Sequence, residues 1–326
     1  MAASLEETLK RFGEQFNWHP VVENPQNLGS HAGYIVAGMG GSHLGAWLIQ
    51  KFDPHLDMTI HRDYGLPALT DTQIRNDLFI ASSYSGTTEE TLDAAQHAFQ
   101  KGMHMAAISL GGDLLKFARE HEIPFVSIPD TGLEPRMAIG YAMLAIARLM
   151  GNEVLENAIR EGGKKVSPSE DQIKGMQLSE KLIGKVPLIW ASSRNIPLAY
   201  IWKVKFNETS KIPAFCNRFP ELNHNEFTGF DVADATRSVT GNFHIIMLED
   251  PKDHPRVQRR MALTRQMLEE RGIGVDVVQL RGEHFQKLFI AALYGDWVAL
   301  GLAKYYGVPN PETPLIAEFK KRMAQH

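Results

Sequence analysis

A turn rich in hydroxyl groups is the clearest chemical signal in this sequence. Five Ser and Thr hydroxyls lie within Ser82–Thr88, between a strand-like apolar run and a helical pattern. Hydroxyls and free backbone N–H groups at the start of a helix suit a phosphate dianion. The alternative is a plain helix cap by Ser85 or Thr87, with Glu89 or Glu90 completing a capping box. Because a cap needs only one hydroxyl, we expect a phosphate-binding loop.

A glycine-rich turn, Gly38–Gly45, follows another strand-like run and also opens a helical pattern. Its backbone N–H groups would face an anion, although such turns are as often tight packing devices. A dinucleotide fingerprint requires Gly at the position of His43, and no Gly-Lys-Ser/Thr follows for a nucleotide P-loop. Nucleotide binding is therefore disfavoured.

Two segments in the second half combine carboxylate, amide and imidazole groups. Phe206–Phe215 contains Glu208, and the helical pattern before it must end at Pro213. Phe219–Phe230 contains His224 and follows neither the helical nor the strand period, so we expect an irregular, packed segment. By residue type alone, such a Glu is more often a surface residue and such a His more often structural. Cys216, the single cysteine, is interpreted as a buried thiol rather than a nucleophile.

The two turns resemble the phosphate loops of sugar isomerase (SIS) domains. Ser83–Thr91, with the sequence SYSGTTEET, resembles the Ser-x-Ser-Gly-x-Thr-x-Glu-Thr loop, and Gly38–Ser42 resembles the first loop of these domains. The resemblance implies that a sugar phosphate is held by the backbone of Gly40 and Gly41 and by the hydroxyls of Ser42, Ser83, Ser85 and Thr88. SIS domains also occur in sugar-phosphate-sensing regulators, so the loops do not define a reaction.

The second-half segments resemble signature sequences of the bifunctional phosphoglucose/phosphomannose isomerases. These segments are NETSKIPA, at 207–214, and PELNHNE, at 220–226, and the match spans nearly the whole chain. The resemblance implies that Glu208 moves a proton between C1 and C2 of a hexose 6-phosphate and that His224 opens the sugar ring. It further implies that Arg136 lies beside the enediolate and that Lys304 assists ring opening.

Aldose–ketose isomerisation fits these residue types. One carboxylate can remove a proton from one carbon and return it to its neighbour, a guanidinium can hold the enediolate, and His titrates in the range needed for ring opening. We expect neither a metal nor an organic cofactor. The 13 histidines are scattered, His121-Glu122 lacks the second His of a zinc helix, and His224-Asn225-Glu226 supplies too few ligands.

Three alternatives stay open. The chain could be a non-catalytic sugar-phosphate-binding regulator, although no basic helix-turn-helix is visible before residue 33. It could be a glucose 6-phosphate isomerase without mannose activity. An amino-sugar phosphate isomerase would usually bring an amide-handling domain or different partner residues, which we do not find. The resemblance also implies a homodimer with the active site near the subunit interface, so that His224 would serve the neighbouring subunit.

The elements that must position these residues follow an alternating pattern. Short apolar runs predict strands at 33–38, 58–62, 78–83, 104–110 and 124–128, and again at 188–192, 243–248 and 275–280. Helical patterns separate most of them, including 198–206, 256–271 and 285–306. The alternation predicts an α/β fold with two mainly parallel sheets flanked by helices. We assign residues 1–152 and 153–326 to two SIS-type domains, the boundary lying between about 152 and 185.

Composition limits the classes of partner. The chain has 326 residues, of which 44% are hydrophobic and 22% charged, as expected for a globular protein with a sizeable core. A net charge of −4 and the absence of a long Lys/Arg run disfavour nucleic acid. No run approaches the roughly 18 apolar residues of a membrane span, and 1–16 lacks the apolar region of a signal peptide. We therefore expect a cytoplasmic protein.

Overall fold

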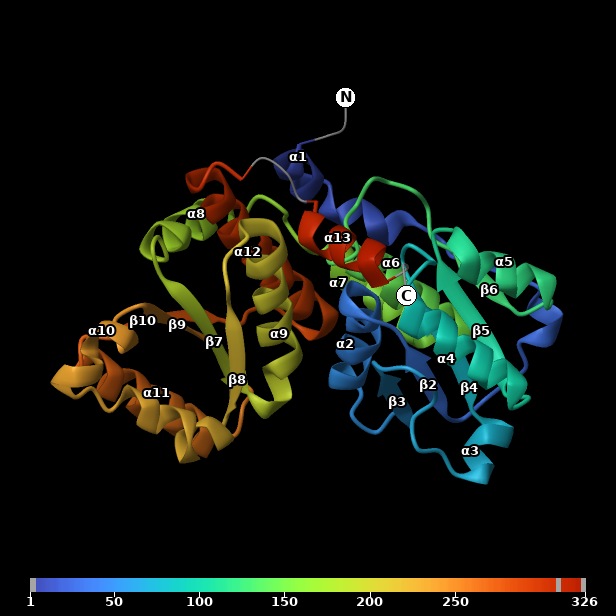
Figure 1. Ribbon diagram of the computed structural model, residues 1–326, viewed down its shortest axis with the longest axis horizontal. Coiled ribbons are helices and arrows are strands. Elements are labelled where there is room, and N and C mark those ends of the chain that lie inside the picture. Colours follow the sequence, from blue (N-terminus) through green and yellow to red (C-terminus); the bar gives the residue numbers. More distant parts are fainter. Residues whose placement is uncertain (1–3, 309–311, 324–326) are drawn as a thin grey trace.

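The first of two sheets contains the hydroxyl-rich turn. The structure is a computed structural model that describes residues 4–308 and 312–323, arranged as two lobes (Figure 1). The first lobe holds a six-stranded sheet of order β1-β6-β5-β4-β2-β3, in which only the β1–β6 pair is antiparallel. Its strands are β1 Val22–Glu23, β2 Tyr34–Ala37, β3 Met58–His61, β4 Leu78–Ser82, β5 His104–Ser109 and β6 Phe125–Ser127.

The second lobe holds a four-stranded, wholly parallel sheet of order β10-β9-β7-β8. Its strands are β7 Val186–Ser192, β8 Phe215–Phe219, β9 Phe243–Glu249 and β10 Gly274–Gln279. The predicted α/β fold class is confirmed. Strands β1 and β8 were not predicted, since β1 has two residues and β8, with the sequence FCNRF, is an edge strand that lacks an apolar run.

Helices cover both sheets. They are α1 Leu5–Lys10, α2 Leu44–Phe52, α3 Asp71–Asn76, α4 Glu89–Gln100, α5 Gly112–Glu120, α6 Ile139–Leu149, α7 Glu153–Lys164, α8 Gln172–Lys181, α9 Ile196–Lys205, α10 Arg237–Thr240, α11 Pro255–Glu269, α12 His284–Tyr305 and α13 Pro314–Met323. The predicted helices at 198–206, 256–271 and 285–306 correspond to α9, α11 and α12. Helices α7 and α8 occupy most of the predicted boundary region between about 152 and 185, and the proposed domain limits stay a prediction.

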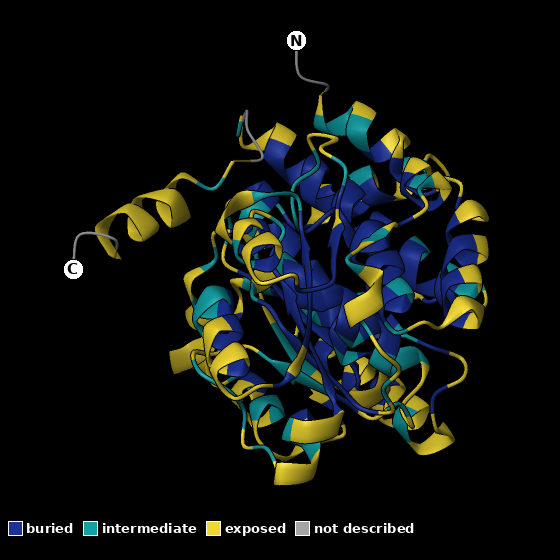
Figure 2. Ribbon diagram, turned by 90° about the vertical axis from the view of Figure 1, so that its right-hand side faces the viewer, coloured by how far each residue is buried: buried dark blue, intermediate teal, exposed yellow. Residues whose placement is uncertain are grey.

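The largest hydrophobic cluster is continuous between the lobes. It contains Phe16 from the first lobe together with Trp202 and Phe289 from the second. Two smaller clusters each lie within one lobe. One surrounds Phe79 in the first lobe, and the other surrounds Trp190 in the second. Buried residues accordingly concentrate at the centre of the molecule (Figure 2). Helix α12 has the length and hydropathy of a membrane span. However, 78% of its most apolar 18-residue stretch is buried inside the protein, as in a core helix.

Candidate active site

The hydroxyl-rich turn connects β4 to α4. Thr88 is the N-cap residue of α4, but no side chain caps the helix, so neither the simple cap nor the capping box considered from the sequence is formed. The hydroxyls bond to one another instead. Ser83 Oγ donates to Thr88 Oγ1 at 2.9 Å and accepts from the Gly86 N–H at 3.1 Å. Gly86 has a φ of 72°, and a Cβ there would lie 1.9 Å from the Gly111 carbonyl oxygen, so this tight turn requires glycine.

The glycine-rich turn packs against the hydroxyl-rich turn. Ser42 Oγ accepts the Tyr84 N–H at 3.0 Å, and Ser82 Oγ donates to the Ser42 carbonyl at 3.0 Å. Ser42 and Ser83 are buried by these contacts, whereas Ser85 is exposed. A hydroxyl that accepts one bond still has a hydrogen to donate. The structure thus brings the four predicted phosphate hydroxyls onto two adjoining turns.

A third loop joins the glycine-rich turn to the predicted cation. A Cβ on Gly41 would lie 2.6 Å from the Pro135 carbonyl carbon and 2.8 Å from the Arg136 nitrogen, so the two backbones are in close contact. Gly40 has a φ of 51° and open space around it. The predicted phosphate loops and Arg136 therefore belong to one region of the first lobe.

Arg136 links this region to the second lobe. Its side chain is fully buried, and its Nη1 lies 3.0 Å from Glu208 Oε2 and 3.4 Å from Glu134 Oε2. Arg136 Nε donates to Thr209 Oγ1 at 3.2 Å. Buried charges are stable when they are paired and hydrogen-bonded. Two predicted catalytic residues that are far apart in sequence are thus in direct contact.

Glu208 is positioned by an irregular extension of α9. Phe206–Ser210 forms a π-helical turn, and the helix ends at Lys211, which has a left-handed φ of 56°. Such π-turns occur frequently at functional sites. Ser210 Oγ donates to the Ala299 carbonyl of α12 at 2.8 Å, which anchors the turn. Asn207 Oδ1 accepts the Ala214 N–H at 2.9 Å, which fixes the chain leading into β8.

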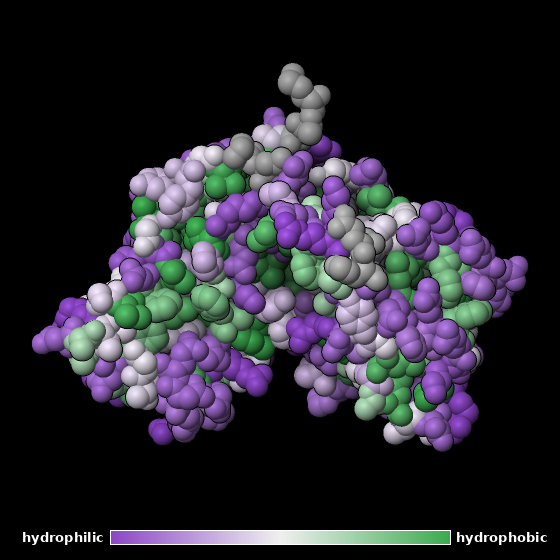
Figure 3. Space-filling model, viewed as in Figure 1, coloured by the Kyte–Doolittle hydropathy of each residue, from purple (hydrophilic) through white to green (hydrophobic). Residues whose placement is uncertain are grey.

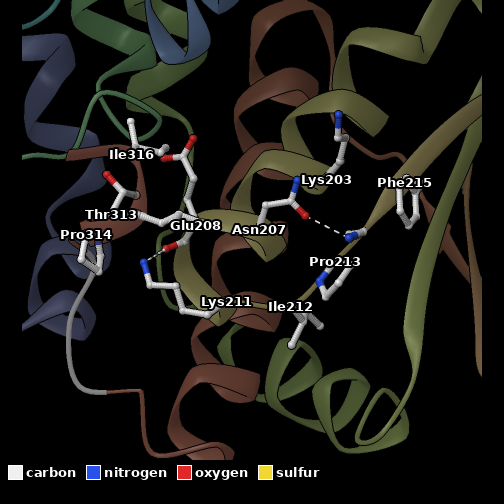
Figure 4. Close-up of a pocket in the computed structure, with 12 residues that line it drawn as sticks. Lys203, Asn207, Glu208, Lys211, Ile212, Pro213, Phe215, Thr313, Pro314 and Ile316 are labelled. Atoms are coloured by element: carbon white, nitrogen blue, oxygen red, sulfur yellow. Dashed lines mark hydrogen bonds between the residues drawn. The ribbon is translucent and has the colours of Figure 1, made fainter. Parts of the chain in front are cut away.

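A pocket of about 670 Å³ opens beside Glu208. Most of its polar lining comes from α9, the π-turn and the residue after it, namely Lys203, Asn207, Glu208 and Lys211. Phe215 lies on one side, and Thr313–Ile316 of the C-terminal segment lie on the other (Figure 4). Lys211 Nζ donates to the Glu208 carbonyl at 2.5 Å and also to the Glu312 carbonyl, which ties that segment to the π-turn.

Apolar side chains form part of the pocket lining. Ile212, Pro213, Phe215, Leu315 and Ile316 all line the pocket. In the space-filling view, apolar atoms occupy a recess at the centre of the molecule, between the lobes (Figure 3). A ligand in such a site is partly shielded from water, which strengthens electrostatic contacts to it.

Burial raises the pKa of the Glu208 carboxyl above its ordinary value of 4.5. The positive charge of Arg136 and its hydrogen bond act in the opposite direction, while the negative charge of Glu134 acts in the same direction as burial. The burial effect is the largest of these. A carboxylate with a raised pKa is a stronger base, which suits it to accept a proton from carbon.

His224 is separated from Glu208 by strand β8, and Lys304 is paired with Glu6. Glu208 precedes the first residue of β8, and His224 follows its last residue, in the 3₁₀ turn Glu221–His224. A five-residue strand spans roughly 16 Å. The His224 side chain is exposed and forms no hydrogen bond or ion pair with residues 4–308 or 312–323. Lys304 Nζ lies 2.5 Å from Glu6 Oε2. The roles assigned to both residues stay predictions.

The structure adds Glu134 and Thr209 to the site. Both contact Arg136. Thr209 directly follows Glu208 in the sequence, and Glu134 is two residues before Arg136. Nothing in their local sequence distinguishes them from ordinary loop and helix residues, so only the three-dimensional contact with Arg136 identifies them. Across the described part of the chain, no three His, Cys, Asp or Glu side chains are grouped so as to hold a metal ion.

Comparison with known proteins adds independent information. The sequence model of a family described as the bacterial phospho-glucose isomerase C-terminal SIS domain matches residues 171–323. The chain is 35% identical to a bifunctional phosphoglucose/phosphomannose isomerase from Caldicellulosiruptor bescii, with 89% of each chain covered. It is 30% identical to a protein of the same description from Aquifex aeolicus, with 98% of each chain covered.

A solved structure shows the same fold at low sequence identity. This is the C-terminal domain of glucosamine-fructose-6-phosphate aminotransferase from Francisella tularensis. The TM-score is 0.67 at 14% identity, over 93% of this chain and 95% of that one. At this identity the likeness extends to the fold alone.

Proposed function

Because the chain belongs to the bifunctional phosphoglucose/phosphomannose isomerase family, we propose that it interconverts glucose 6-phosphate and mannose 6-phosphate with fructose 6-phosphate. The observation that carries this proposal beyond family membership is the 3.0 Å contact between Glu208 and the buried Arg136, beside a pocket and next to the two hydroxyl- and glycine-rich turns. In this proposal they would serve as the base, the cation and the phosphate site.

In the proposed reaction, Glu208 removes the C2 proton of the open-chain aldose. The electrons form a C1–C2 double bond, and the aldehyde oxygen O1 becomes negatively charged. The guanidinium of Arg136 stabilises this enediolate through fixed N–H donors. Glu208 then returns its proton to C1, while the O2 proton is transferred to O1, and C2 becomes the ketone carbon. Since the proton is carried by one carboxylate, neither a metal nor an organic cofactor is needed in this scheme.

The sugar phosphate would be held at the first sheet. We assign it to the hydroxyls of Ser42, Ser83, Ser85 and Thr88 and to the backbone of Gly40 and Gly41. The start of α4 adds the favourable end of a helix dipole. The phosphate would thereby orient C1 and C2 towards Glu208 on the second lobe.

Ring opening is assigned to His224 with help from Lys304. Because His224 lies beyond the far end of β8 from Glu208, we propose that it acts in the site of a neighbouring subunit of a homodimer. An exposed imidazole suits that role. We propose that the protein acts in the cytoplasm on hexose 6-phosphates.

Substitution Glu208→Gln tests the assignment. We expect kcat with each aldose phosphate to fall by about 10²- to 10⁴-fold, the usual contribution of a general base, while binding of a hexose 6-phosphate changes little. Fructose 6-phosphate formation is measured separately from glucose 6-phosphate and mannose 6-phosphate. The matched control is Glu120→Gln, which removes one exposed carboxylate at the end of α5.

The outcomes separate the alternatives. Undiminished turnover in the Glu208→Gln variant would overturn the catalytic assignment. Wild-type protein that binds hexose phosphate but does not convert it would be a sugar-phosphate-binding regulator. Conversion of glucose 6-phosphate alone would reduce the activity to that of a glucose 6-phosphate isomerase.

A further inference from the structure

One guanidinium serves two carboxylates at the proposed site. Arg136 Nη1 lies 3.0 Å from Glu208 Oε2 and 3.4 Å from Glu134 Oε2, and both contacts involve the same nitrogen. Glu134 is two residues before Arg136, and its side chain is 30% exposed. The two carboxylates therefore share the single positive charge of this guanidinium. The loop that supplies the cation therefore also supplies a competitor for it.

The sharing of Arg136 by two carboxylates affects how readily Glu208 can take up a proton. An arginine paired with a single carboxylate favours the ionised form of that carboxylate and so opposes proton uptake. A second carboxylate on the same guanidinium weakens that effect. We propose that Glu134 is a positioning residue for the isomerisation: it shares Arg136 with Glu208, so that the cation stays in place for the enediolate while Glu208 stays able to accept a proton. This inference rests on the proposed function.

The other charged groups around Glu208 do not replace Glu134. Lys211 donates to the Glu208 and Glu312 backbone carbonyls. Its positive charge also lowers the pKa of Glu208, but by less than the charge of Glu134 raises it. Lys203 lines the pocket, and its Nζ lies 5.0 Å from the centre of the Tyr200 ring. Lys205 is paired with Asp296 inside the protein. Among these groups, Glu134 is the carboxylate that shares the cation of Glu208.

Two variants separate charge from shape. Glu134→Gln keeps the length of the side chain but removes its charge, whereas Glu134→Asp keeps the charge but shortens the side chain. Carbon-13 NMR of labelled glutamate carboxyls follows the titration of Glu208, whose signal is assigned by its loss in Glu208→Gln. We expect the Glu208 midpoint to fall by about one pH unit in Glu134→Gln and to stay near the wild-type value in Glu134→Asp.

Kinetics should follow the same order. In Glu134→Gln, the acidic limb of the kcat/KM profile moves to lower pH, and its plateau falls about two- to fivefold because the base is weaker. The ionisation of the substrate phosphate is common to all variants and cancels in the comparison. Glu120→Gln is the control, because Glu120 is exposed on α5 and outside this cluster.

An unchanged Glu208 midpoint in Glu134→Gln would overturn the proposal, as would an equal shift in Glu134→Asp. Glu134→Ser removes the same charge and carries the test if the glutamine variant does not fold. Lack of isomerase activity in the wild-type protein would instead refute the proposed function. The NMR midpoint does not require turnover, so the two failures are distinguishable.

Discussion

Glu208 is held between opposing influences. Burial disfavours its charged form, whereas the buried Arg136, in direct contact, favours it. Because burial is the larger influence, the carboxyl is a better base than an exposed glutamate at the same pH. The same arginine is placed to stabilise charge that develops on a substrate. This balance makes Glu208 a stronger base than an ordinary glutamate, while the contact with Arg136 favours its ionised form.

His43 allows a separate test at the level of one residue. Burial lowers the pKa of His43 to about 4, and the positive charge of Arg62 acts in the same direction. Its ring lies 5.8 Å from that of Trp47 and 5.6 Å from that of Tyr200. The nearby Gly40 backbone offsets part of the burial effect, but neither ring nitrogen has a hydrogen-bond partner of ordinary geometry among the described residues.

Replacing His43 with Phe should flatten the acid dependence of stability. Between about pH 6.5 and 4 the unfolded chain binds a proton at His43 that the folded protein does not, so wild-type stability falls as pH falls. At pH 5 this effect amounts to about 2 kcal/mol. Urea unfolding at pH 7 and pH 5 measures it, with the exposed His55→Gln as control. Equal losses in wild type and His43→Phe would contradict the prediction.

The sequence located the site residues unequally. The two strand-to-helix turns could be located because glycines and hydroxyls are local signals of such turns, whereas their phosphate-binding role stays a prediction. Glu208 and His224 gained roles only from a family resemblance. Glu134 could not be predicted, because its significance comes from sharing Arg136 with Glu208, a contact between residues over seventy positions apart.

Helix α12 supports the element that carries Glu208. Trp202 Nε1 of α9 donates to the Ala291 carbonyl at 2.8 Å, and Ser210 Oγ of the π-turn donates to the Ala299 carbonyl. Helix α12 therefore anchors α9 and its π-turn at two positions along its length. Between these positions, Lys205 pairs with Asp296, and both side chains are almost fully buried. The π-turn is thus fixed from behind while its front faces the pocket.

Breaking the buried pair should cost more than removing it. Asp296→Asn leaves the Lys205 ammonium buried without its counter-charge, and we expect a loss of about 3 to 5 kcal/mol. The double variant Lys205→Met/Asp296→Leu replaces both charges with apolar groups. Its free energy of unfolding should lie within about 2 kcal/mol of the wild-type value. Urea unfolding measures both. A double variant as unstable as Asp296→Asn would show that the pair itself supplies the stability.

The buried central strands could be predicted from the sequence, whereas the edge strand β8 could not. The buried central strands are continuous apolar runs, so their positions follow from hydrophobic pattern alone. The edge strand β8 carries Asn217 and Arg218, and its sequence favours a loop. Its strand state comes from pairing with β7, which is a tertiary contact.

At the scale of the whole molecule, the proposed chemistry needs more than one chain. Within a chain, β8 separates Glu208 from His224, so a site that uses both would combine them from two subunits. A two-fold dimer would then contain two identical shared sites.

A mixed dimer tests this arrangement. Subunits carrying Glu208→Gln and His224→Ala are co-expressed with different affinity tags, and the heterodimer is purified through both. With shared sites, one site has both wild-type residues and the other has neither, so we expect about half of the wild-type activity. With self-contained sites, each lacks one residue and no activity is recovered. A protein that sediments as a monomer would also refute the shared site.

The continuous core between the lobes has a consequence for synthesis. The ring of Phe16 lies 4.5 Å from that of Phe289, centre to centre, and a Cβ on Gly163 would collide with Phe16. Translation at about 5 to 20 residues per second takes on the order of 15 to 50 seconds to cover the roughly 270 residues between these two rings. During that time Phe12 and Phe16 lack their final partner. The first aromatic side chains to emerge from the ribosome are therefore among the last to complete their packing.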